Sequence, residues 1–98
     1  MAPTNLLTIQ VGHHVTSELK RLRSNERHPW DAVIVTVRRS LGRTVADVAA
    51  VDVIADFPLP VPAALRMAET LLQDHKLKRI AVIVDDGEWR PEWGKLVE

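Results

Sequence analysis

Five consecutive residues in the first half of the chain, Val33-Ile34-Val35-Thr36-Val37, carry side chains that are all branched at Cβ. Such side chains lose rotamer freedom in a helix and pack well on a pleated sheet, so the run predicts a strand from about Asp31 to Arg38. Any fold for this chain must therefore contain a sheet. The length of 98 residues allows one hydrophobic core. We expect a single α/β domain over residues 1–98, with residues 88–98 as a Trp-bearing C-terminal tail.

The segment that follows this strand predicts a hairpin. Ser40-Leu41-Gly42-Arg43 has the composition of a short chain reversal. With a four-residue loop, apolar side chains fall on one face in three cross-strand pairs, which are Val35 with Val48, Val37 with Ala46, and Val33 with Ala50. A helix around residues 45–49 is the alternative, but it leaves Val51, Val53 and Phe57 outside any pattern. We therefore favour a strand, with a bulge, in residues 43–57.

The remaining elements follow from periodicity and from proline. Alternation over Leu7–Val11 predicts a strand, and Val15, Leu19 and Leu22 have the spacing of one helical face. Pro58, Pro60 and Pro62 should end the pairing of the hairpin, and Pro62 suits the first turn of a helix lasting to about His75. Its apolar stripe contains Ala64, Leu65, Ala68, Leu71 and Leu72. Ile80–Val84 predicts a last strand, which Asp85-Asp86-Gly87 ends with a turn.

The predicted order of elements is strand, helix, strand, strand, helix, strand. This is the order of the ferredoxin-like βαββαβ fold, an α+β sandwich with a mostly antiparallel four-stranded sheet and two helices. One observation opposes it, because Ile80–Val84 is apolar on both faces although the last strand of that fold lies at a sheet edge. A second copy of the chain, or the tail, could cover the open face. A small parallel α/β sheet with residues 44–50 helical is the alternative fold.

Composition narrows the classes of protein further. The chain has 13 basic and 13 acidic residues, and a hydrophobic fraction of 46%, which is ordinary for a globular domain. The absence of cysteine excludes disulfide frameworks, thiolate zinc sites and cysteine nucleophiles. We find no signal-peptide pattern, and the longest apolar run is far below the ~20 residues of a membrane helix. We expect a soluble cytoplasmic protein with no membrane contact and no cofactor.

Basic residues should gather at one end of the predicted fold. The candidates for an anion-binding end are Arg38, Arg39, Arg43, Lys78 and Arg79, and in that topology they lie opposite Asp31, Asp85, Asp86 and Glu88. Phosphate, a nucleotide or a nucleic-acid backbone would suit such an end. Nucleic acid is the less favoured partner, because the sequence pI is about 6.9 and no aromatic residue interleaves the basic runs.

The sequence offers little support for catalysis. Asp85 and Asp86 follow a strand and could seat a divalent cation, which gives a metal-assisted enzyme as one hypothesis. His13-His14 could serve a metal or a proton transfer, although a solvated pair is the simpler interpretation. The chain has no glycine-rich phosphate loop and no Gly-x-Ser-x-Gly elbow. We therefore assign no catalytic residue and no metal ligand, and we lean against an enzyme.

Three tryptophans provide the last candidate site. Trp89 and Trp93 are four residues apart in the tail, and Trp30 precedes the first predicted β-branched strand. Tryptophan both fills cores and anchors interfaces. The preferred hypothesis is a small non-catalytic interaction or regulatory domain. It would form a homodimer or bind a protein partner through its sheet face and tail. Anion or nucleic-acid binding through the basic end is the alternative.

Overall fold

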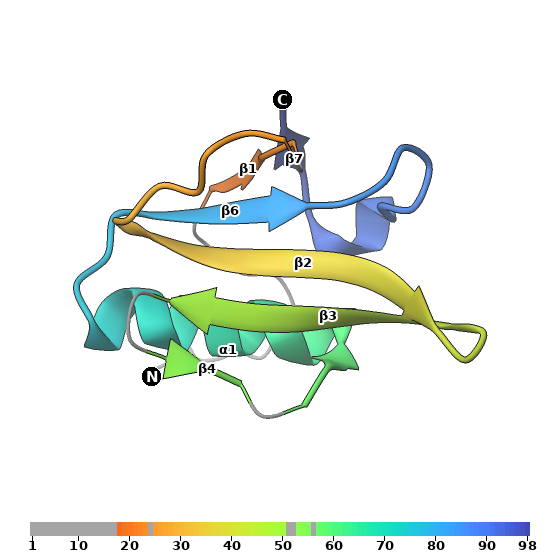
Figure 1. Cartoon of the computed structure of the whole chain (residues 1–98), viewed down its shortest axis with the longest axis horizontal. Helices are drawn as coiled ribbons and strands as arrows, with labels where there is room; N and C mark the ends of the chain where they lie inside the picture. The colour runs from red at the N-terminus through yellow and green to blue at the C-terminus, as the bar shows by residue number, and fades with distance from the viewer. Residues whose placement is uncertain (1–17, 24, 51–52, 56) are drawn as a thin grey trace, which may run out of the picture.

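A mixed β-sheet with one helix on one face makes up the described part of the chain, residues 18–23, 25–50, 53–55 and 57–98 of a computed structural model (Figure 1). Six strands lie in the order β4-β3-β2-β6-β1-β7, and β5 pairs with β3. The strands are β1 (Leu19–Arg21), β2 (Ala32–Ser40), β3 (Arg43–Ala50), β4 (Val53–Ile54), β5 (Leu59–Pro60), β6 (Arg79–Ile83) and β7 (Leu96–Val97). The helix α1 spans Val61–Asp74, and the 3₁₀ helix η2 spans Pro91–Trp93.

The predicted hairpin is present, with the predicted register. β2 and β3 are antiparallel, and Val35 pairs with Val48 and Val37 with Ala46. Ser40 and Arg43 also pair, so the loop itself is Leu41-Gly42, whose φ angles are 52° and 78°. Two successive positive φ angles are typical of the type I′ turn, whose twist matches that of the flanking strands. Residues 43–50 are therefore strand and not helix.

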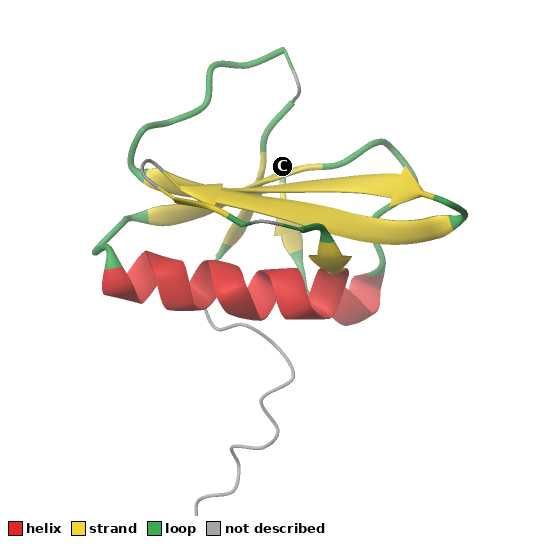
Figure 2. Cartoon of the chain, turned by 60° about the horizontal axis from the view of Figure 1, so that its bottom comes forward, coloured by secondary structure: helices red, strands yellow, loops and turns green. Residues whose placement is uncertain are grey.

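Strand β6 lies inside the sheet, between β2 and β1, and is parallel to both. Ile80 and Val82 face α1 in the main core, and Ala81 packs with Ala32 and Ile34 on the other face. The connection from β1 to β2 passes over that second face (Figure 2). A central strand with cover on both sides explains why its sequence is apolar throughout.

Helix α1 agrees closely with its prediction. It begins one residue before Pro62, which occupies the first turn, and it buries Val61, Ala64, Leu65 and Ala68 against the sheet. Figure 2 shows it lying along one face of the sheet. In the described ranges, no helix combines the length and the apolar character that a membrane span requires.

The ferredoxin-like fold class is wrong. The described residues contain one α-helix, and the sheet has three parallel and three antiparallel strand pairs. The parallel alternative with residues 44–50 helical is wrong as well, because β3 occupies them. Residues 19–21 form β1 instead of the predicted first helix, since Leu19 pairs with Ile80 in the core. The predicted strand at residues 7–11 lies outside the described residues.

Pro58, Pro60 and Pro62 do not end the pairing as completely as predicted. Leu59–Pro60 pairs with the edge of β3, opposite Val45 and Ala46. An edge position tolerates proline, because the missing N–H is not needed by a further strand. This short edge strand leads directly into α1 and so fixes the start of the helix beside the hairpin.

Candidate anion-binding site

Four arginines line a cavity of about 690 Å³ where the β2–β3 hairpin, the start of α1 and η2 meet. Arg39 and Arg43 come from the hairpin, Arg66 from α1 and Arg90 from the residue before η2. The apolar part of the lining consists of Pro60, Val61, Pro62, Leu65 and Trp93. The volume is within the range of pockets that hold small ligands.

Strand alternation separates Arg39 from its neighbour Arg38. Val35 and Val37 point into the core beneath α1, so Arg39 extends toward the same side and Arg38 toward the other. Arg38 Nε donates a hydrogen bond of 2.6 Å to Asp47 Oδ2, and this bond raises the pKa of Arg38. Arg38 is therefore paired on the opposite face of the sheet and does not belong to the cavity.

The same alternation applies to β3, where Ala46 and Val48 point into the core, so Thr44 extends toward the cavity side and Arg43 toward the face of Arg38. Arg43 therefore borders the cavity at the hairpin turn but is not directed into it.

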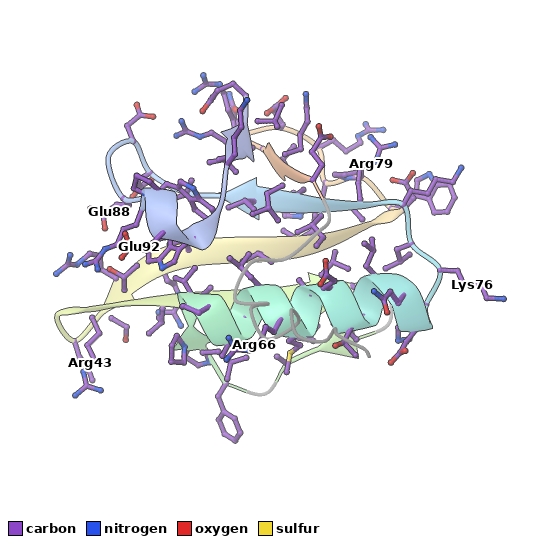
Figure 3. All side chains as sticks on the ribbon, turned by 180° about the vertical axis from the view of Figure 1, so that it is seen from behind. Arg43, Arg66, Lys76, Arg79, Glu88 and Glu92 are labelled. Atoms are coloured by element: carbon purple, nitrogen blue, oxygen red, sulfur yellow. The ribbon has the colours of Figure 1, made fainter. Side chains whose placement is uncertain are left out.

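The arginines of the cavity are only loosely engaged by acidic groups. Arg39 Nη1 lies 3.9 Å from Glu88 Oε1, and Arg90 Nη1 lies 3.8 Å from Glu92 Oε2. Arg43 and Arg66 have no carboxylate oxygen within 4.0 Å in the described ranges. Figure 3 shows Arg43 at the end of the molecule that also carries Glu88 and Glu92. The lining therefore contains more positive than negative charge.

The first turn of α1 adds to this positive potential. Val61 and Pro62 line the cavity, and the turn contains no acidic residue and no side chain that caps it. Unpaired N–H groups give a helix N-terminus a partial positive charge. In this position the charge reinforces the field of the arginines.

In the tail, Trp93 forms the aromatic wall of the cavity, and Trp89 packs against it. The rings of Trp89 and Trp93 meet edge to face at 5.2 Å, and Trp89 Nε1 donates a hydrogen bond of 2.9 Å to the carbonyl oxygen of Gly94. Trp93 is 9% exposed and packs in the main core. The Arg90 guanidinium lies 5.7 Å from the centre of the Trp93 ring, a cation–π contact that orients it. Trp30 lies apart from this wall and is 79% exposed.

Lys78 and Arg79 lie at the other end of the sheet. Because β6 is parallel to β2, Arg79 pairs with Ala32 at the start of β2, while Arg39 lies near the end of β2. Seven residue-to-residue steps along the strand lead from Ala32 to Arg39, a distance of about 23 Å. Arg79 Nη2 also bonds to Asp31 Oδ2 at 3.3 Å. The predicted separation of a basic end from an acidic end is therefore wrong, and Figure 3 shows Arg43 and Arg79 far apart.

A second polar cavity, of about 410 Å³, lies at the carboxyl ends of β1 and β6. Arg21 Nη2 donates hydrogen bonds to Asp86 Oδ1 at 2.7 Å and to the carbonyl oxygen of Val84 at 2.8 Å. The bond from Arg21 lowers the pKa of Asp86, and the same bond raises that of Arg21. Arg21 Nη1 also lies 3.4 Å from Glu98 Oε2. Arg21 therefore joins β1 to the last turn and to the end of the chain.

Asp85 and Asp86, the acidic pair noted in the sequence, make different contacts. Asp86 faces Arg21, and the carbonyl oxygen of Asp85 accepts a hydrogen bond from the Glu88 N–H. No group of three metal-ligating side chains occurs within residues 18–23, 25–50, 53–55 and 57–98. His13 and His14 lie outside the described residues.

The basic residues named from the sequence include Arg39 and Arg43 but not Arg66 and Arg90. No local pattern in the sequence relates Arg66 or Arg90 to the hairpin. The sequence feature that could have indicated them is Ile80–Val84, which is apolar on both faces, as is typical of a central parallel strand. A central parallel strand after a helix fixes the positions of that helix and of the tail that follows the strand. Comparisons with protein-family models, with curated proteins and with solved structures find no match to this chain.

Proposed function

We propose that this protein binds a small phosphorylated ligand in the arginine-lined cavity. The observation that carries the proposal is that Arg39, Arg66 and Arg90, from three separate parts of the chain, line one cavity. Guanidinium groups bind phosphate oxygens through paired N–H donors, which makes arginine the side chain best suited to this task. Arg66, which has no ion-pair partner among the described residues, is available to such a ligand without breaking an ion pair.

A nucleic-acid backbone fits the arrangement less well than a small ligand does. Binding to a long phosphate chain requires a continuous basic surface. Outside the cavity, Arg38 is paired with Asp47, Arg79 with Asp31, and Arg21 with Asp86. These pairs interrupt a basic stripe across the molecule.

Self-association through the sheet face and the tail stays a prediction. The exposed Trp30 is compatible with it, whereas Trp93 packs inside the same protomer. A homodimer and a protein partner both remain alternatives to ligand binding, and a cytoplasmic location also stays a prediction. We prefer the cavity because its chemistry specifies a ligand.

The test is a calorimetric titration of the full chain with pyrophosphate at low ionic strength. Arg39→Ala and Arg66→Ala should each weaken binding by about tenfold or more, since a hydrogen bond to a charged group contributes ~1.5–3 kcal/mol. Arg38→Ala is the matched control, because Arg38 adjoins Arg39 in sequence but faces the other side of the sheet. Absence of binding, or equal losses in all three variants, would contradict the proposal.

A further inference from the structure

The size of the arginine-lined cavity is much greater than one phosphate group requires. Its lining also extends beyond the arginines to Pro60, Pro62, Leu65 and Trp93. A phosphate bound to the arginines would leave these apolar side chains in contact with water. The ligand should therefore also have an organic part, an inference that rests on the proposed function.

The apolar lining indicates the character of that organic part. Pro60, Pro62 and Leu65 belong to the lining, and these side chains offer no hydrogen bond to a sugar hydroxyl. Arg90 lies over the Trp93 ring and also lines the cavity, so a flat ring in the cavity can stack on the same guanidinium. Both features favour a planar, largely apolar group over a simple sugar.

Glu92 restricts the ligand further. Its carboxylate lines the cavity among the arginines, 3.8 Å from Arg90. A carboxylate accepts hydrogen bonds and repels a second anion, so the ligand should present hydrogen-bond donors at this position. The hydroxyl groups of a ribose are donors of this kind.

An extended phosphopeptide is the less suitable ligand. Peptides often bind by adding a strand to a free sheet edge. Beside the cavity the edge of β3 is already occupied, because Val45 and Ala46 pair with Pro60 and Leu59 of β5. The available space is a cavity and not an open strand edge.

We infer that the ligand is a nucleoside monophosphate, with its phosphate on Arg39 and Arg66, its ribose hydroxyls on Glu92, and its base against Arg90 and the apolar residues. The cavity thus provides one type of surface for each part of the nucleotide. The polar cavity at the ends of β1 and β6 has arginines in its lining but no aromatic residue.

The experiment compares adenosine 5′-monophosphate, ribose 5-phosphate, inorganic phosphate and adenosine by calorimetric titration of the full chain. The nucleotide should bind at least about fivefold more tightly than ribose 5-phosphate, as expected when a base stacks. Adenosine alone should bind more weakly than the nucleotide. If phosphate and ribose 5-phosphate bind as tightly as the nucleotide, and Arg66→Ala weakens all three, this inference fails while the proposed function stands. If no phosphate compound binds, both fail.

The Glu92→Gln variant tests the ribose contact separately. In the wild type, the ribonucleotide should bind about fivefold more tightly than its 2′,3′-dideoxy analogue, because a hydrogen bond to a carboxylate is lost. The variant should reduce this preference and bind inorganic phosphate at least as tightly as the wild type does. Glu92 is on the surface, so the substitution should leave folding intact. An unchanged preference in the variant would overturn the assignment of Glu92.

Discussion

The central position of β6 predicts a large loss of stability in Ile80→Ala. Ile80 has 0% exposure and packs in the main core beneath α1. The substitution removes three buried carbon groups, worth ~0.8 kcal/mol each on transfer, and leaves a cavity that adds to the loss. We expect a decrease of about 3–4 kcal/mol in the free energy of unfolding. This is a large share of the ~5–15 kcal/mol that stabilises a typical domain.

Urea denaturation followed by tryptophan fluorescence measures this loss, since Trp93 packs in the same core. With a slope of ~1–3 kcal/mol per M, the midpoint should fall by roughly 1–3 M. Ile54→Ala is the matched control, because Ile54 lies on the edge strand β4 and is 78% exposed. It should change stability by less than about 0.5 kcal/mol. Similar losses in the two variants would show that β6 is not the central strand.

Three further predictions follow from individual contacts. The pKa of Asp86 is lowered in the folded protein by its hydrogen bond with Arg21. This bond therefore stabilises the fold at pH values above the ordinary pKa of an aspartate, and the stabilisation is lost as the pH falls through the lowered pKa. The stability difference between wild type and Asp86→Asn should therefore shrink between about pH 5 and pH 2 in urea titrations, and a constant difference would refute this. Glu88→Gln frees Arg39 from an ion pair of 3.9 Å, and pyrophosphate should bind up to about fivefold more tightly in calorimetry, since such exposed pairs contribute up to ~1 kcal/mol. Leu41→Asn should raise the melting temperature by several degrees. Leu41 is fully exposed and has a φ of 52°, a conformation that costs a leucine ~1–2 kcal/mol but that asparagine tolerates. An unchanged or lower melting temperature in calorimetric scans would show that the turn is not strained.

The elements with clear periodicity were predictable from the sequence. The β-branched run gave β2, the pairing of Val35 with Val48 gave β3 and its register, and the stripe through Ala64 and Leu65 gave α1. Each of these signals is local and spans several turns or several strand residues. Strand β1 has three residues, and Leu19 and Leu22 are spaced equally well for one face of a helix. Its identity depends on pairing with Ile80, which no local pattern records.

The candidate site was predictable only in part for the same reason. The register of the hairpin places Arg39 opposite Thr44 and Arg43 opposite Ser40, so both arginines lie near its turn. Arg66 joins them because β5 pairs with β3 and leads into α1, and Arg90 because β6 runs parallel to β2 and returns the tail to the end of the hairpin. The predicted antiparallel direction of β6 instead placed Lys78 and Arg79 there. A single error of strand direction therefore changed the membership of the site.

The location of β1 between β6 and β7 has a consequence for synthesis of the protein. Leu19 pairs with Ile80 on one side and with Leu96 on the other, so both neighbours of this strand leave the ribosome long after it does. The β2–β3 hairpin and α1 can assemble earlier, because their contacts are closer in sequence. Until β6 and β7 have both been translated, β1 retains unpaired backbone groups on at least one side. A nascent chain that is released early therefore exposes a strand able to pair with other molecules.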